Sequence, residues 1–117
     1  MIKIEKPKIH THFAYPEGRA SCLTKTAPRG DLPLVVTLHG YDILTEPSCK
    51  YGVRLYPQYG VLIRKVLSNG DAIIVLSTAV YREAQKIVNP YKLHLIHNGV
   101  DLNKFHPGLS GFRTLYK

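Results

Sequence analysis

The stretch of sequence that decides the fold is PLVVTLHGYD, residues 33–42. A continuous apolar and β-branched run of this length is typical of a strand that is buried on both faces of a parallel sheet. The run ends on His39 and Gly40, and Asp42 follows. Because ligands of open parallel sheets bind beyond the carboxyl ends of the strands, we expect His39 and Asp42 to lie where such a fold does its chemistry. A plain turn, in which Gly40 only supplies backbone freedom, is the alternative.

Three more apolar runs predict strands, and segments with helical spacing lie between all four runs. The predicted strands cover residues 8–13, 34–38, 72–76 and 93–97, and the predicted helices cover residues 17–27, 57–69 and about 78–88. This β-α-β-α-β-α-β order predicts a single α/β, Rossmann-like domain in which helices flank a parallel sheet of about four strands. A (β/α)₈ barrel is disfavoured because it needs about 250 residues, and this chain has 117.

Each predicted helix carries an apolar stripe that we expect to face the sheet. The stripes consist of Ala20, Leu23 and Ala27 in the first helix, Tyr59, Leu62, Ile63, Val66 and Leu67 in the second, and Val80, Ala84, Ile87 and Val88 in the third. Pro57 suits the first position of the second helix, and Gly70 suits the residue just past its end. Ser77 or Thr78 can cap the third helix.

The composition limits the partners that the chain can bind. Sixteen Lys and Arg residues against eight Asp and Glu residues give a net charge of +8, which favours nucleotides, phosphorylated sugars or acidic membrane surfaces. The basic residues are scattered, so a nucleic-acid partner is not expected. No run approaches the ~18 apolar residues that span a bilayer, and residues 1–6 show no secretory signal. With Cys22 and Cys49 as free thiols, we expect a cytoplasmic protein; peripheral contact with the inner face of a membrane stays open.

The connection from Gly40 to Tyr56 is longer than the ~12–15 residues beyond which unstructured loops are usually functional or disordered. It carries Tyr41, Tyr51 and Arg54 among other aromatic and cationic side chains. Such side chains near a strand end suit a sugar or a phosphate. A solvated loop without a binding role fits the sequence equally well.

Histidines offer a different interpretation of the same strand ends. His10 and His12 share one face of the first predicted strand, because strand side chains alternate. Together with His39 they supply three ligands, the number that a catalytic zinc site takes from its protein, so a metal-dependent hydrolase is one alternative function. The simpler interpretation is that one histidine fills the core while the other hydrogen-bonds at the strand end. His94 and His97 are expected to be structural and to face opposite sides of the last strand. A small basic module that binds anions is another alternative function.

Four motifs in order carry a family resemblance. They are HTHFAYPEG at residues 10–18, TLHGYD at 37–42, DAIIVLS at 71–77 and IHNGVDLNKFHP at 96–107. The series resembles the amino-terminal domain of the retaining, two-domain GT-B glycosyltransferases of family 4. The resemblance implies an incomplete half of a GT-B fold, with residues 1–101 as a partial amino-terminal domain. Residues 102–117 would then be a linker or tail toward a carboxyl-terminal domain outside this chain.

This resemblance implies a retaining transfer of a sugar from a nucleotide-sugar donor to a sugar or lipid-linked acceptor. The amino-terminal half binds the acceptor, and the second domain binds most of the donor, so this half is expected to be inactive alone. The donor is a substrate, and neither a cofactor nor a metal is expected. One departure from the family pattern is Lys8, which stands where relatives usually carry Asp.

The resemblance also assigns site residues. His39 takes the position of the histidine that contacts the donor sugar near the reacting centre. Asp42 binds sugar hydroxyls or orders the loop. The remaining substrate-binding positions are His12, Tyr15 and Gly18 in the acceptor-side loop, Gly40 beside the histidine, Ser77 at the cleft edge, and Asn98 before the linker.

Overall fold

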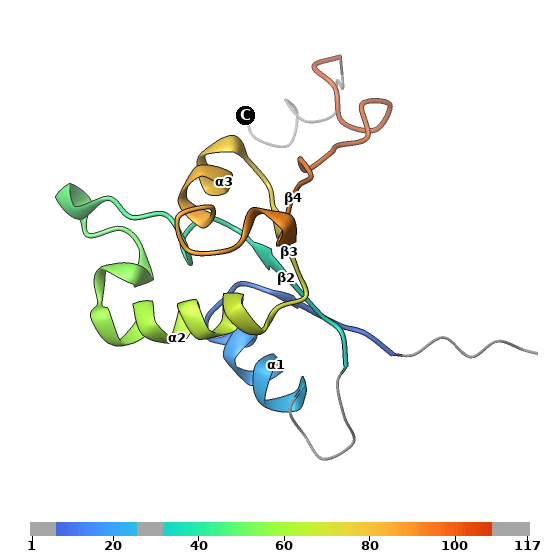
Figure 1. Cartoon of the computed structure of the whole chain (residues 1–117). Helices are drawn as coiled ribbons and strands as arrows, with labels where there is room; N and C mark the ends of the chain where they lie inside the picture. Colours follow the sequence, from blue (N-terminus) through green and yellow to red (C-terminus); the bar gives the residue numbers. More distant parts are fainter. Residues whose placement is uncertain (1–6, 26–31, 109–117) are drawn as a thin grey trace, which may run out of the picture.

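The computed structural model describes residues 7–25 and 32–108 of the chain. Its centre is a sheet of four strands, β1 (Ile9–His12), β2 (Leu34–Leu38), β3 (Ala72–Val75) and β4 (Leu93–Leu95). The strands lie in the order β1-β2-β3-β4, and every neighbouring pair is parallel (Figure 1). The predicted α/β fold and the alternation of strands with helices are therefore confirmed.

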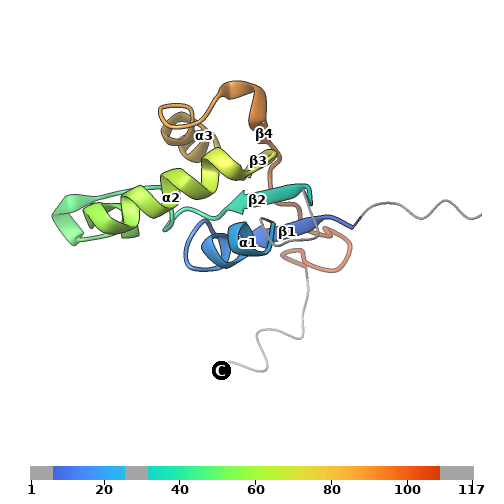
Figure 2. The same ribbon diagram turned by 60° about the horizontal axis from the view of Figure 1, so that its bottom comes forward.

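Three helices connect the strands: α1 (Glu17–Lys25), α2 (Pro57–Asn69) and α3 (Thr78–Ala84). The short 3₁₀ helices η1 (Pro47–Cys49), η2 (Val53–Leu55) and η3 (Pro90–Lys92) lie in the connections. The three α-helices follow one another in the same order as the strands they join (Figures 1 and 2). α1 packs against α2, β1 and β2, while α3 packs against β3 and β4. No helix in the described residues is long and apolar enough to span a bilayer.

One core lies between the helices and a single face of the sheet. The strand register aligns Thr11, Val36, Ile73 and Leu93 across that face, and all four are buried. The buried apolar residues of the three helices belong to the same cluster. On the opposite face Thr37 is buried, whereas Val35 is only half-buried. The prediction that residues 34–38 are buried on both faces is therefore wrong at Val35.

The local signals of α2 and α3 are confirmed. α2 begins with Pro57, and its predicted stripe contains the fully buried Ile63, Val66 and Leu67. Gly70 follows the helix as its C-cap with a φ of −65°. The Ser77 side chain caps α3 by accepting the backbone N–H of Val80 at 3.3 Å. α3 ends at Ala84, earlier than predicted, and turns continue to the buried Val88.

The predicted stripe of α1 is wrong. Ala20 and Leu23 are exposed, and Ala27 lies outside the described residues. Gly18 and Cys22, one turn apart, face the core instead. Without a side chain, Gly18 lets the first turn of α1 approach Val66 of α2, and this contact sets the rotation of the helix.

The two edge strands are shorter than predicted. β1 stops at His12, because Phe13 takes a left-handed backbone conformation with φ 71°. β4 stops at Leu95, so His97 lies beyond the strand and the expected opposite orientation of His94 and His97 does not apply. Both histidines are exposed. The boundary at residue 101 stays a prediction, and residues 109–117 lie outside the described part.

Asp71 joins three elements at the start of the sheet. Its Oδ2 accepts the backbone N–H of Leu34 at 2.7 Å and the Nζ of Lys25 at 2.5 Å. The hydrogen bond from Lys25, followed by the one from Leu34, lowers the pKa of Asp71. A carboxylate with a lowered folded-state pKa stabilises the fold above its unfolded pKa, about 3.9. This stabilisation is lost as the pH falls through the folded value.

We therefore expect Asp71→Asn, which keeps an acceptor for Leu34 but removes the charge, to destabilise the fold at neutral pH. The loss should be below about 1 kcal/mol, because more than half of the Asp71 side chain is exposed. Urea unfolding at neutral pH, and again below the folded pKa, measures the difference. The gap between variant and wild type should close in acid; a gap that widens there would contradict the linkage.

Candidate functional site

The carboxyl ends of β1 and β2 bring His12, Phe13 and His39 together. Nδ1 of His12 lies 2.9 Å from Nε2 of His39 in a hydrogen bond between the two rings. The Phe13 ring stacks on His39 with a centroid separation of 4.5 Å and an interplanar angle of 27°. All three side chains are exposed. The structure thus places the predicted catalytic histidine at the strand ends, in contact with the predicted acceptor-side loop.

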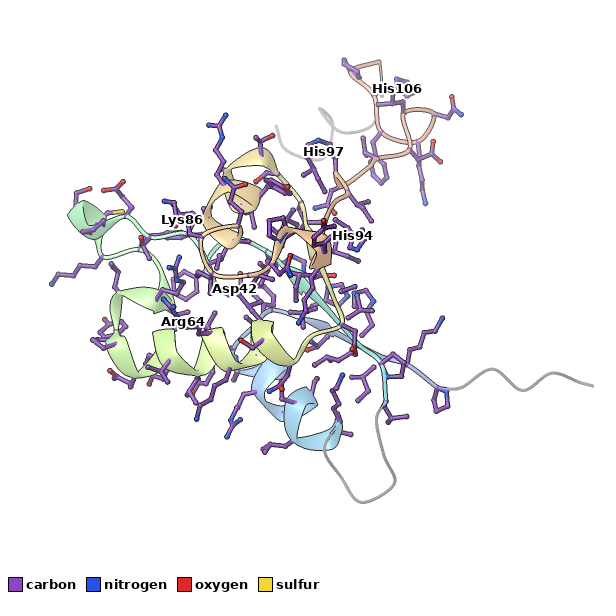
Figure 3. The ribbon with its side chains drawn as sticks, viewed as in Figure 1. Asp42, Arg64, Lys86, His94, His97 and His106 are labelled. Carbon is purple, nitrogen blue, oxygen red and sulfur yellow. The ribbon has the colours of Figure 1, made fainter. Side chains whose placement is uncertain are left out.

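The side chain of Asp42 binds the backbone of both loops of this site. Its side chain is fully buried. One oxygen, Oδ2, accepts the backbone N–H of Ala14 at 2.7 Å, and Oδ1 accepts those of His39 and Gly40, both at 3.1 Å. Figure 3 labels Asp42 among the ribbons in the middle of the domain. Of the two roles that the resemblance allows Asp42, these contacts are those of ordering the loop.

Gly40 has the backbone conformation that its sequence position suggested. Its φ is +126°, a region that L side chains rarely adopt, so the turn itself favours glycine. A Cβ at this position would also lie 3.7 Å from the hydroxyl oxygen of Tyr51. The turn directs the chain so that Ile43 and Leu44 donate their N–H groups back to the Gly40 carbonyl at 3.0 and 2.6 Å.

The connection after Gly40 has local structure, although residues 45–51 are all exposed. Glu46 and Tyr51 pair as an antiparallel bridge, and Tyr51 contacts Tyr41 edge to face with centroids 5.2 Å apart. Nη1 of Arg54 donates to the carbonyl of Ile43 at 2.6 Å and lies 3.3 Å from Oε2 of Glu83 on α3. The hydrogen bond from Lys86, and then that from Arg54, lower the pKa of Glu83. The loop is therefore braced against α3.

The three histidines considered as metal ligands do come together, but their nitrogens are directed at other partners. Nε2 of His10 hydrogen-bonds Oγ1 of Thr37 at 2.7 Å, and His12 hydrogen-bonds His39. The His10 and His12 rings lie 4.7 Å apart. Within residues 7–25 and 32–108, no three His, Cys, Asp or Glu side chains are arranged to hold a metal ion. The expectation that one histidine fills the core is also wrong, since His10 and His12 are both exposed.

The remaining predicted site residues have structural contacts of their own. Gly18 lies at the packing contact of α1 with α2, and Ser77 caps α3. Tyr15 is half-buried, with its ring 5.0 Å from that of Tyr59 on α2. Asn98 lies on the exposed segment that leads away from β4, along which Figure 3 labels His97 and His106. No hydrogen bond in the described residues joins Asn98 to the pair at His39.

Phe13 is the site residue that the sequence did not reveal. The only local signal is its place between a strand and the Tyr15–Pro16 turn, and a positive φ is uncommon for a residue other than glycine. Its backbone is held at both ends, because its N–H donates to Thr37 at 2.9 Å and its carbonyl accepts from Gly18 at 3.1 Å. These bonds fix the direction in which the aromatic ring points.

Comparison with known proteins agrees with the fold. The family model described as Glycosyltransferase Family 4 matches residues 8–104, which is most of the chain. The chain therefore belongs to glycosyltransferase family 4. No curated protein matches it. The family supports a glycosyltransferase function in general and does not favour the metal-dependent hydrolase or the simple anion-binding module.

We expect the isosteric change Asp42→Asn to destabilise the fold by about 2–3 kcal/mol. An amide has a single acceptor oxygen, so its NH₂ group must face at least one of the backbone N–H groups that Asp42 now satisfies. Asp101→Asn is the matched control, because Asp101 is exposed and accepts one N–H, that of Asn103 at 2.9 Å. The control should change stability by less than about 0.5 kcal/mol. Equal urea midpoints for the two variants would show that Asp42 does not hold the loops.

We expect Gly18→Ala to destabilise the fold by about 1–3 kcal/mol, the range for overpacking a core. The new Cβ would lie 2.7 Å from Cγ1 of Val66 and 3.1 Å from the Phe13 carbonyl oxygen. Gly60→Ala within α2 is the control, because its Cβ would meet nothing closer than 3.8 Å. That change should stabilise the helix by up to about 1 kcal/mol. Thermal unfolding of both variants gives the comparison, and a neutral Gly18→Ala would refute the close-packing role.

Proposed function

We propose that this chain is the acceptor-binding half of a retaining glycosyltransferase, in which His39 contacts the transferred sugar. The observation that carries the proposal is the state of the His39 ring. It is exposed at the carboxyl edge of the sheet, yet it is held by His12 on one side and by Phe13 on another. An exposed side chain that is nevertheless fixed in one orientation is what a substrate-contacting group requires.

The chemistry of a retaining transfer suits such a residue. The transition state carries positive charge on the sugar, so dipoles and hydrogen bonds placed in advance stabilise it more than a strong base would. Asp42 places the His39 and Gly40 backbone by accepting both of their N–H groups. The carboxylate therefore contributes to the reaction through the loop that it orders, and His39 supplies the contact with the sugar.

The donor is proposed to be a nucleotide sugar, bound mainly by a second domain outside these 117 residues. Its leaving diphosphate needs cationic groups or a helix amino-terminus. At the His39 site the contacting side chains are His12 and Phe13, which do not form such a cradle. We infer that the second domain supplies it, and that the chain alone does not complete the transfer. No cofactor beyond the donor is required by this scheme.

The acceptor is proposed to be a sugar or a lipid-linked sugar. The net charge of +8 supports an anionic partner, which a lipid-linked phosphate or a nucleotide provides. Arg64 and Lys65, exposed on α2, are two of the residues that carry this charge. A location in the cytoplasm, with peripheral contact to the anionic inner face of the membrane, is consistent with such an acceptor and forms part of the proposal.

We expect His39→Ala to abolish or weaken sugar binding while leaving the fold intact, because the side chain is exposed and the backbone bonds to Asp42 remain. The ligand panel consists of methyl α-glucoside, methyl α-mannoside, UDP-glucose and GDP-mannose, each titrated by calorimetry. Unfolding curves establish that the variant is folded. The matched control is His94→Ala, which removes an exposed histidine from β4, away from the site.

Three outcomes would contradict the proposal. The first is that no member of the ligand panel binds. Binding that His39→Ala leaves unchanged would remove His39 from the site. Sugar transfer from UDP-glucose or GDP-mannose by the purified 117-residue chain would show that no second domain is needed.

A further inference from the structure

The hydrogen bond between His12 and His39 couples the hydrogens of the two rings. Nδ1 of His12 and Nε2 of His39 lie 2.9 Å apart. A neutral imidazole has one nitrogen that donates and one that accepts. Since two N–H groups cannot face each other at this distance, only one of the two facing nitrogens carries a hydrogen. The choice on one ring therefore fixes the choice on the other.

The intrinsic chemistry of imidazole indicates which ring donates. A neutral histidine side chain is more stable with its hydrogen on Nε2 than on Nδ1. If His39 donates, both rings have this more stable form; if His12 donates, both must take the less stable one. The neighbouring histidine fits the same pattern, because Nε2 of His10 can donate to Oγ1 of Thr37 at 2.7 Å. This preference favours His39 as the donor and His12 as the acceptor.

The rest of the His39 surroundings leave one ring nitrogen for a ligand. Phe13 covers a face of the ring at a centroid distance of 4.5 Å, and its own backbone is fixed by Thr37 and Gly18. Nε2 is engaged by His12. Within the part of the chain that the structure describes, Nδ1 of His39 makes no hydrogen bond. That nitrogen then carries a lone pair and can only accept.

We propose that His12 is a positioning residue: it accepts the Nε2–H of His39, and it thereby presents the Nδ1 lone pair of His39 as the acceptor for a sugar hydroxyl. The arrangement of the two rings stands on the free protein, while the identity of the hydroxyl as that of a sugar rests on the proposed function. His12 acts through His39 and need not touch the substrate. This is a narrower role than the direct substrate contact that the resemblance implies for it.

Nitrogen NMR of the free 117-residue chain tests the arrangement without any ligand. With ¹⁵N-labelled histidines at a pH that keeps the rings neutral, His39 should show one form, with hydrogen on Nε2. A scalar coupling across the hydrogen bond should connect Nε2 of His39 with Nδ1 of His12. Absence of that coupling, or a His39 with its hydrogen on Nδ1, would overturn the inference.

Two substitutions of His12 distinguish the effect of its hydrogen-bond acceptor from the effect of its size. In His12→Asn, the Oδ1 atom takes the position of Nδ1 on the same Cγ, so an acceptor remains. In His12→Phe a ring remains against His10, but the acceptor is lost. We expect the Phe variant to give a mixture of both His39 forms and weaker binding of the sugar that binds best in the ligand panel. The form with hydrogen on Nε2 stays the more stable one, so the dissociation constant should rise by less than about twofold, the inverse of the fraction of rings that keep this form. The Asn variant should keep the wild-type form and most of the affinity.

His94→Phe is the matched control, because the strand register places His94 on the same sheet face as His12. It should leave the His39 spectrum and the affinity unchanged. If His12→Phe alters neither, His12 does not position His39 and the inference fails. If the coupling is present but no member of the ligand panel binds, the proposed function fails while the arrangement of the rings stands. The two proposals can thus be refuted separately.

Discussion

The site depends on the buried carboxylate of Asp42. Two loops that are far apart in the sequence follow β1 and β2. Each begins with backbone N–H groups that lie beyond the strand and need hydrogen-bond acceptors. Asp42 takes three of them, from Ala14, His39 and Gly40. A buried charge is costly unless hydrogen bonds satisfy it, and a buried N–H is costly without an acceptor, so each group stabilises the burial of the other. The loops are consequently held to the sheet and to one another.

The hydrogen bonds of Asp42 also help to order residues that lie further from the sheet. The backbone N–H of His39 is bound to Asp42, and its ring contacts His12 and Phe13. On the other side the chain runs into the connection that Arg54 ties to Glu83 of α3. Groups that are exposed to solvent therefore have defined positions without being buried themselves. In parallel α/β sheets generally, rigid strands hold the loops at which ligands bind.

Patterns within one segment predicted much of this arrangement, whereas contacts between segments did not follow from them. The alternation of strands with helices, the limits of α2 and the capping role of Ser77 depend on spacing that is visible along the chain. The rotation of α1 depends on the approach of Gly18 to Val66, which no periodicity in residues 17–27 encodes. For His12 and His39 the sequence predicted only that they lie close together at strand ends. It did not predict the hydrogen bond between their rings. The left-handed backbone of Phe13 had no signal, because the residue type argues against it.

Residue 13 is a position where backbone stability and the ordering of His39 favour different amino acids. A φ of 71° suits glycine, and the chain would lose backbone strain if glycine stood there. An aromatic ring is what stacks on His39, and glycine has none. Selection for a more stable domain would therefore tend to remove the ring, and selection for an ordered His39 would keep it. The phenylalanine found there records which of the two demands prevailed in this chain.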